Sequence, residues 1–408
     1  MRGRAPGQLI IQYTDKCNAT CPQCDMRMSA DFKRSTLAYD TAQRSIDPAA
    51  ANGVMALSIT GGEPLLYLKD VSALLRRAHD GGIPFTRTGT NGFLLANFAS
   101  AGFEHRVARL AQTLVDARLY TFWISIGSAD PVVHEAMRGL PGAIEGIKRS
   151  LPIFHAHGIY PSVNLGINRN LSGPECPRYP NPQDTYDFFR HGFRRFYQMV
   201  IDMGFTIANC CYPMSVPADG SDAGLTAVYQ ATAGSAIVDF SREERVEIYR
   251  ALYDTIPEYR GRIRIFTPRT SLLSLMRQHT VGDERVAACR GGNDYFFVDA
   301  QRGHAFPCGY RGTEDLGPYW EMALDQLPAT PPCRKCDWEC WRDPSELAAP
   351  ALMAATRPWD LAARASADPA YLKHWVQDLR YLHACNYFSA RTQPDYARMA
   401  RFAAAARA

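Results

Sequence analysis

Three cysteines near the start of the chain stand in a spacing that suits an iron–sulfur cluster. Cys17, Cys21 and Cys24 follow one another as Cys-x3-Cys-x2-Cys, directly after the short apolar run 9–14. Three thiolates are one fewer than a [4Fe–4S] cluster normally takes, so one iron would stay open to another ligand. Structural zinc usually takes four closed ligands, and neither a histidine nor a fourth cysteine lies nearby in the sequence. The spacing therefore favours a cluster with an open iron over a zinc site or unrelated core thiols.

A second group of cysteines lies in the last third of the chain. Cys289 and Cys308 flank the strand-like segment 295–298, a pattern that predicts a β-hairpin bringing the two thiols together. Cys333 and Cys336 form a Cys-x2-Cys pair able to hold one face of a metal centre, and Cys340 follows them. Two such pairs can close four ligands around an iron–sulfur cluster or a zinc ion.

The first triplet belongs to an ordered set of motifs. Cys-x3-Cys-x2-Cys resembles the signature of the radical S-adenosylmethionine (radical SAM) enzymes. A Gly-Gly-Glu-Pro run resembles the family's GGE motif, and later segments are similar to the ends of its third, fourth and fifth strands. The matches cover residues 8–215. The positions that correspond to SAM-binding residues of the family are Gly61, Gly62, Glu63, Asn91, Ser125 and Asn168.

The resemblance implies a cofactor and a reaction. In this family, SAM chelates the open iron through its amino and carboxylate groups. The Gly-Gly-Glu segment would hold the amino group, Ser125 would reach the ribose, and the strand that ends at Asn168 would lie beside the adenine. Reductive cleavage of SAM then gives a 5′-deoxyadenosyl radical, which takes a hydrogen atom from the substrate.

The second cysteine group resembles the auxiliary-cluster extension called SPASM, or its shortened form, twitch. Too few thiols are present for a second complete auxiliary cluster. The resemblance therefore implies one auxiliary [4Fe–4S] cluster, with Cys340 as a competing fourth ligand, or zinc as the alternative. Full ligation would make that cluster an electron relay, whereas an open iron would let it bind substrate. The favoured ligands are Cys289, Cys308, Cys333 and Cys336.

The first half of the chain alternates apolar β-type runs with helix-like segments, which predicts βαβ units and a parallel sheet. The expected strands are 9–14, 54–60, 85–90, 120–126, 160–168 and 205–211, and the expected helices are 71–79, 107–117, 143–157 and 186–203. These elements predict an α/β fold, a partial (β/α)6 TIM-like barrel, which is also the fold that the resemblance implies. The candidate residues fall at the carboxyl ends of strands, where parallel barrels carry their chemistry.

The expected divisions follow the same motifs. We expect a radical SAM partial barrel over 1–215, a connector over 216–285, a cysteine-rich twitch/SPASM-like domain over 286–345, and C-terminal helices over 346–408. A further helix is expected over 241–259, with Ser241 as its N-cap and acidic residues in its first turn.

Two adjacent thiols end the sixth expected strand, near the place where substrate should lie. Neighbouring residues of a strand face opposite sides, so at most one of Cys210 and Cys211 points into the barrel. A buried thiol is more often an inert small hydrophobe. The functional alternative is that one of them donates a hydrogen atom to a substrate radical.

Composition limits the class of protein. Apolar residues make up 46% of the 408 residues and the net charge is +4, which predicts a globular protein without the basic stripe of a nucleic-acid binder. The sequence has neither a long apolar span nor a secretory leader, so we expect a cytoplasmic protein that does not enter the membrane. Twelve cysteines in such a chain indicate metal binding and not disulfides.

The substrate is less constrained than the cofactors. The first expected strand begins near residue 8, without an N-terminal leader-binding domain before it, so we expect a small molecule as substrate. The alternative substrate is a ribosomal peptide recognised through a separate protein. An external one-electron reductant such as flavodoxin or ferredoxin is the expected partner. The competing class is a non-enzymatic, zinc-stabilised binding scaffold.

Overall fold

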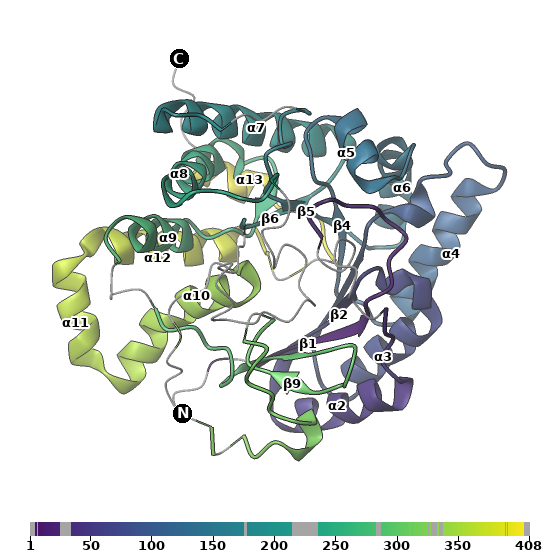
Figure 1. The fold of residues 1–408 in the computed structure, drawn as a ribbon, viewed down its shortest axis with the longest axis horizontal. Coiled ribbons are helices and arrows are strands. Elements are labelled where there is room, and N and C mark those ends of the chain that lie inside the picture. Colours follow the sequence, from purple (N-terminus) through teal and green to yellow (C-terminus); the bar gives the residue numbers. More distant parts are fainter. Residues whose placement is uncertain are drawn as a thin grey trace.

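A mostly parallel sheet organises the chain, which is described by a computed structural model over residues 5, 7–24, 34–174, 178–213, 236–282, 287–309, 311–324, 326–327, 333, 338–387, 389 and 391–403 (Figure 1). Within these residues the strand order is β7-β6-β5-β4-β3-β2-β1-β8-β9, and only the β8–β9 pair is antiparallel. No ladder joins β7 to β9 in the described part of the chain, so the barrel is partial. The strands are β1 Gly7–Thr14, β2 Val54–Gly61, β3 Phe85–Thr90, β4 Thr121–Ser125, β5 Ser162–Gly166, β6 Ile207–Cys211, β7 Arg264–Ile265, β8 Tyr295–Val298 and β9 Ala305–Phe306.

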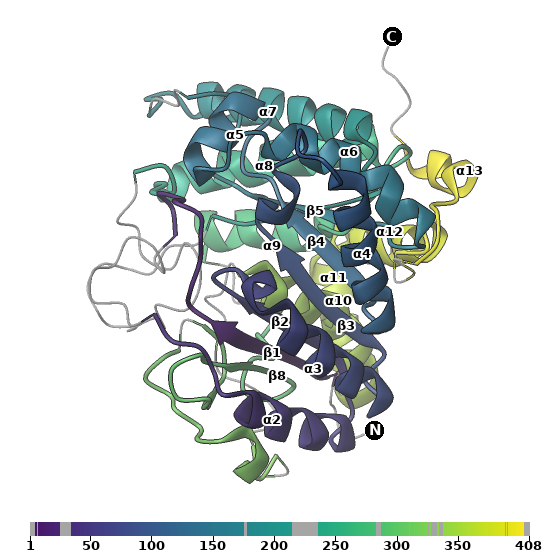
Figure 2. The ribbon, with the colours of Figure 1, turned by 90° about the vertical axis from the view of Figure 1, so that its right-hand side faces the viewer.

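Helices follow most of the strands and cover the outer face of the sheet (Figures 1 and 2). The helices of the barrel are α2 Tyr39–Ala51, α3 Leu68–Asp80, α4 Phe103–Asp116, α5 Pro131–Arg138, α6 Ala143–Ala156, α7 Pro182–Met203, α8 Arg242–Tyr259 and α9 Arg269–Thr280. The C-terminal helices are α10 Glu339–Thr356, α11 Pro358–Ala367, α12 Pro369–Ala384 and α13 Tyr396–Met399. Ser241 caps α8, and its side chain and that of Glu244 form a reciprocal capping box.

All six expected strands and all four expected barrel helices are present. The β4 and β5 strands are shorter than expected, in part because Pro161 has no N–H for a ladder and because the chain turns away after Gly166. Helix α2 was not expected, since Pro48 lies inside it and its N-cap residue, Ala38, makes no side-chain hydrogen bond. The segment 295–298 does form a hairpin with β9, and it also extends the barrel sheet by pairing in parallel with β1.

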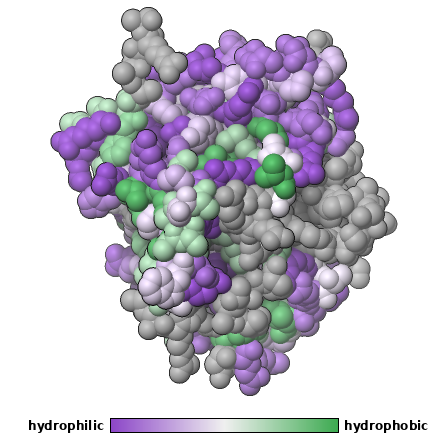
Figure 3. Space-filling view, turned by 90° about the vertical axis from the view of Figure 1, so that its left-hand side faces the viewer, coloured by the Kyte–Doolittle hydropathy of each residue, from purple (hydrophilic) through white to green (hydrophobic). Residues whose placement is uncertain are grey.

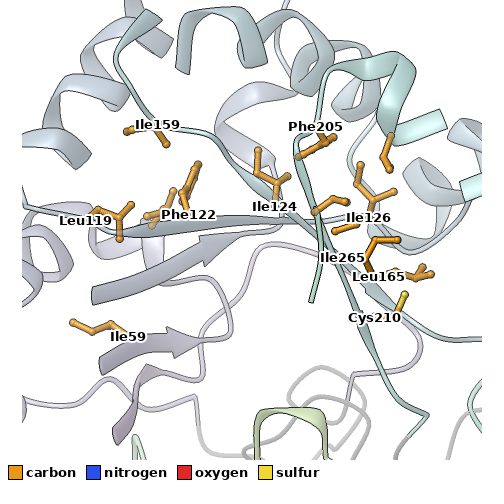
Figure 4. Packing of buried hydrophobic residues seen from close by; sticks show 14 of the residues in the cluster. Ile59, Leu119, Phe122, Ile124, Ile126, Ile159, Leu165, Phe205, Cys210 and Ile265 are labelled. Carbon is orange, nitrogen blue, oxygen red and sulfur yellow. The ribbon is translucent and has the colours of Figure 1, made fainter. Parts of the chain in front are cut away.

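The strands divide their side chains between two faces. On the outer face, apolar residues such as Leu57, Ile124 and Leu165 pack with the helices in the main hydrophobic core, and Figure 4 shows part of this layer. Burying such side chains contributes about 1.5–3 kcal/mol each. On the inner face, β1 and β8 pack Ile10 and Tyr295 against residues around the start of α10. The inner face is therefore the one on which cysteines of the second group gather.

The surface beside the C-terminal helices is mixed in character. Figure 3 shows the side of the molecule on which α11 lies, where hydrophobic groups are separated by hydrophilic residues. Trp359 at the start of α11 is 85% exposed. Among the described residues, no helix combines the length and the apolar character needed to cross a membrane. The division of the chain into four units remains a prediction.

Candidate functional site

The first cysteine group lies in the loop that leaves the carboxyl end of β1. Cys17, Cys21 and Cys24 are all partly exposed. The backbone N–H of Ala19 donates to the Sγ of Cys17 across 3.4 Å. The backbone N–H of Thr20 donates to the last carbonyl of α5 across 2.9 Å, which ties this loop to the segment after β4. The three thiols are thus held at the edge of the sheet where chemistry is expected.

Two glycines let the end of β2 lie directly against this loop. The N–H of Gly62 donates to the carbonyl of Thr14 at 2.7 Å, and the N–H of Glu63 donates to that of Lys16 at 2.9 Å. A Cβ atom on Gly61 would stand 2.3 Å from the carbonyl oxygen of Thr14, and one on Gly62 would stand 2.3 Å from that of Lys16. Only glycine fits so close an approach of two backbones.

The Glu63 carboxylate joins three of the sequence motifs. Its oxygens accept hydrogen bonds from the backbone N–H groups of Asn91, at 2.6 Å, and Leu65, at 3.1 Å. The side-chain amide of Asn91 in turn donates to the Sγ of Cys17 at 3.6 Å and to Asn18 at 2.9 Å. Burial raises the pKa of Glu63 to about 7, against the lowering effect of these N–H donors.

A row of polar side chains crosses the inner face at the strand ends. Ser125 on β4 pairs in register with Asn164 on β5, which pairs with Asn209 on β6. Paired residues of parallel strands point to the same face, and their neighbours Ile124, Leu165 and others pack outward. The Oδ1 atom of Asn209 is buried without a hydrogen-bond partner among the described residues.

Asn168 occupies a more structural position than the other predicted SAM contacts. Its side-chain amide donates to the carbonyls of Gly127, at 2.7 Å, and Gly166, at 2.8 Å. Its Oδ1 accepts from the N–H of Asn170 at 2.8 Å. The side chain is fully buried, and it holds together the turns that follow β4 and β5.

The two thiols at the end of β6 point to opposite faces, as expected. Cys210 lies in the outer hydrophobic layer (Figure 4), and its Sγ lies 3.6 Å from the hydroxyl of Tyr197 on α7. Burial raises the pKa of Cys210 to about 12. Cys211 has the opposite parity and therefore faces inward, where it hydrogen-bonds with the side chain of Glu339 at the start of α10.

Four thiols of the second cysteine group gather on the inner face of β1 and β8. Cys289 and Cys308 are buried in one apolar cluster, and the partly buried Cys333 and Cys340 pack against it. The N–H of Cys289 donates to the carbonyl of Cys333 at 2.9 Å, so the hairpin and the later cysteine segment are in direct contact. Cys336 lies outside the described residues.

Aromatic rings enclose these thiols. Trp338 and Trp341 stack with their ring centroids 4.4 Å apart and 12° between their planes. Trp341 also meets Tyr295 edge to face, and its indole N–H donates to the carbonyl of Pro307 at 2.8 Å. Trp338 and Trp341 are themselves buried, and apolar surroundings of this kind affect the redox properties of a cluster bound beside them.

Several inward-facing residues were not singled out by sequence motifs. Arg87 on β3 pairs in register with Ser58 and faces inward. The side chain of Trp123 lies against Gly89, since its indole nitrogen would stand 2.0 Å from a Cβ placed there. Glu339 is buried, and burial raises its pKa. Arg87 could have been noticed in the sequence, because a charged residue in the middle of a parallel strand is unusual.

The residues present fit the cofactors that the motifs imply. The three loop thiols are partly exposed, an amide lies against one of them, and the two glycines after β2 bring their backbone directly against the loop. Among the described side chains, no three His, Cys, Asp or Glu residues are placed to share a single metal ion. A cubane does not need such a group, since its thiolates bind separate irons.

Comparison with known proteins finds similarity to one family in the N-terminal part of the chain. The profile of the radical SAM superfamily matches residues 11–168. The AdoMet-dependent heme synthase of Nitratidesulfovibrio vulgaris is 24% identical over 301 residues, which cover 73% of this chain and 72% of that protein. The PqqA peptide cyclase of Ruegeria pomeroyi is 35% identical over 169 residues, or 41% of each protein.

The fold extends beyond the matched domain. The structure of SuiB from Streptococcus suis bound to S-adenosylmethionine superposes with a TM-score of 0.51 at 16% identity, over 78% of this chain and 65% of that one. This likeness concerns the fold alone. Other curated relatives, including a probable GTP 3′,8-cyclase of Halobacterium salinarum, align over 44% of their own length.

Proposed function

We propose that the chain is an enzyme that cleaves SAM reductively and takes a hydrogen atom from its substrate, because residues 11–168 match the model of the radical SAM superfamily. A [4Fe–4S] cluster with bound SAM would supply the electron transfer and the 5′-deoxyadenosyl radical. The chain's own residues would bind these groups, orient the substrate and exclude water.

The hydrogen-bonded chain from Glu63 through Asn91 to Cys17 carries this proposal. It joins the glycine motif, the end of the third strand and the cysteine loop by contacts of 2.6 and 3.6 Å. We assign Cys17, Cys21 and Cys24 as the cluster ligands. For SAM we assign the backbone of Gly61 and Gly62 with the side chains of Glu63, Asn91 and Ser125, and the turn held by Asn168.

We further propose one auxiliary [4Fe–4S] cluster in the second cysteine group. Cys289, Cys308, Cys333 and Cys336 are the favoured ligands and Cys340 is the competing fourth ligand. The gathering of four thiols in one aromatic enclosure supports a metal centre there. Zinc is the alternative occupant, and metal analysis separates the two.

The proposed substrate is a small molecule, and a peptide is the second candidate. The similarity to a PqqA peptide cyclase favours the peptide. Where the reaction leaves a substrate radical to be quenched, we assign Cys211 as donor in preference to Cys210, since only Cys211 faces inward. A flavodoxin or ferredoxin would supply the electron.

Anaerobic reconstitution tests the proposal. The protein should hold about eight irons, or about four if the second site holds zinc, and dithionite with SAM should release 5′-deoxyadenosine. Cys24→Ala should abolish the release, whereas Cys385→Ala, a matched change of a buried thiol in a separate core cluster, should leave it. Release that survives Cys24→Ala, or protein without iron, would contradict the assignment.

A further inference from the structure

On the inner face of the barrel, one arginine has no counter-ion among the described residues. Arg87 shares its register row with Ile10 and Ser58, whose outward neighbours pack with the helices. Its side chain therefore projects inward from β3, the strand that ends at the proposed SAM site. The residue retains partial solvent exposure, although burial lowers the pKa of the guanidinium. It is thus positioned where a bound molecule could reach it.

No carboxylate among the described residues pairs with Arg87. Its Nε atom is buried without a hydrogen-bond partner, and its side chain makes no ion pair in the described part of the chain. The groups that influence it electrostatically are the thiol of Cys340 and the phenol of Tyr387. Other buried arginines have partners: Arg260 pairs with Asp378 at 2.6 Å, and Arg264 donates to the carbonyl of Ser389 at 3.0 Å. An unpaired guanidinium costs free energy unless a ligand compensates it.

Hydrogen-bond acceptors without partners occur elsewhere on the inner side. The Oδ1 of Asn209 on β6 and one carboxylate oxygen of Glu339 on α10 are buried and make no hydrogen bond with a described residue. Strand β6 lies three positions from β3 in the sheet order, so the interior carries donors on one side and acceptors on another. A ligand with a carboxylate and an amino group would satisfy both, and Trp123 lies on β4, the strand next to β3.

We propose that Arg87 binds the carboxylate of an amino-acid substrate inside the barrel. The inference rests on the proposed function, because it assigns the substrate class of the same enzyme. The planar guanidinium can donate two parallel hydrogen bonds to a carboxylate, which fixes its orientation as well as its position. With the carboxylate held by β3, the rest of the substrate extends toward the carboxyl ends of the strands.

Binding measurements test this without turnover. Calorimetry on the anaerobically reconstituted protein with SAM would compare the proteinogenic L-amino acids with their C-terminal amides. At least one acid should bind, and its amide should bind about 10- to 100-fold more weakly. Arg87→Met should weaken binding of the acid by a similar factor and leave binding of the amide unchanged. Arg87→Lys should retain part of the affinity for the acid. Iron content and circular dichroism would verify that each variant folds.

Three results would overturn the inference. In the first, no amino acid binds to the unaltered protein. In the second, the unaltered protein binds an acid and its amide equally well. In the third, Arg87→Met binds the acid as tightly as the unaltered protein does. In another outcome, Arg87→Met shifts the midpoint potential of the auxiliary cluster but does not change the affinity for amino acids. The guanidinium would then act on the thiol of Cys340, and the inference would also be overturned. Failure of the proposed function shows separately, as missing 5′-deoxyadenosine in the unaltered protein.

Discussion

The two cysteine groups of this chain lie on the same sheet in contrasting surroundings. The first occupies a loop at the carboxyl end of β1, with all three thiols partly exposed. The second lies on the inner face of β1 and β8, where Cys289 and Cys308 are buried against stacked indoles. The first group is tied to its neighbours by hydrogen bonds between loops, and the second by apolar packing together with the backbone hydrogen bond from Cys289 to Cys333.

This difference separates two tasks that one metal centre performs poorly. Loop thiols held by backbone contacts leave one side of a cluster accessible to a second ligand such as SAM. Thiols enclosed by aromatic rings favour a shielded centre, because excluded water and fixed surroundings stabilise one redox state. The contrast makes the effects of single substitutions in the two groups distinguishable.

The largest expected effect separates the two groups by activity. Cys21→Ala should reduce dithionite-dependent release of 5′-deoxyadenosine below detection, because it removes a proposed ligand of the SAM-binding cluster. Cys308→Ala should keep most of that release while losing about four of about eight irons. Chromatography of the nucleoside and iron analysis measure both. Equal loss of release in the two variants would remove the distinction.

The next effect concerns the aromatic enclosure. Trp341→Ala should lower the free energy of unfolding by about 3–5 kcal/mol, because it empties a fully buried site and leaves the carbonyl of Pro307 without its donor. The exposed Trp359 is the matched control, and its replacement by Ala should change the free energy by less than about 0.5 kcal/mol. Urea titration of the two variants gives the comparison, and similar midpoints would argue against a packed enclosure.

A smaller effect is expected at the glycine cradle of the first group. Gly62→Ala should lower the free energy of unfolding by about 1–3 kcal/mol and weaken SAM binding, because the new Cβ would meet the Lys16 carbonyl. Gly127→Ala is the control for the free energy of unfolding, since the nearest atom to its Cβ would be 3.9 Å away. Thermal denaturation and SAM titration measure the two effects. Wild-type behaviour of Gly62→Ala would show that the two backbones separate easily.

The smallest effect is a difference in thiol reactivity of metal-free protein. Iodoacetamide should modify Cys21 faster than Cys308, because the first thiol is partly exposed and the second is buried. Mass spectrometry of timed digests measures each site, with the buried Cys385 as a reference. Faster labelling of Cys308 would show that the second group opens in the absence of metal.

Local patterns predicted much of this molecule. The strands and the cysteine, glycine and asparagine motifs depend on residues close in sequence, so apolar runs and spacing identify them. The α5 helix was not predicted, although Asp130 followed by Pro131 is an N-cap signal that could have identified it. The parallel pairing of β8 with β1 was not predictable this way, because it joins residues almost three hundred positions apart.

The inner face shows the same limit. Strand parity predicts that Cys210 and Cys211 face opposite sides, yet which of them faces inward depends on how β6 pairs with β5. The groups that act electrostatically on Arg87 are Cys340 on α10 and Tyr387 after α12. Both are distant in sequence, so the sequence alone shows Arg87 only as a charged residue within a strand. Contacts between distant elements therefore decide which residues line the interior.

The ladder between β1 and β8 has a consequence for handling the protein. With β8 in place, β1 is an interior strand with neighbours on both sides. If loss of metal loosens the second cysteine group, β8 can detach and leave β1 as an open edge. That edge carries the sequence Leu-Ile-Ile-Gln-Tyr, whose unpaired backbone is a template for intermolecular β-pairing. Precipitation of metal-depleted protein would then begin at the strand that leads into the first cysteine loop.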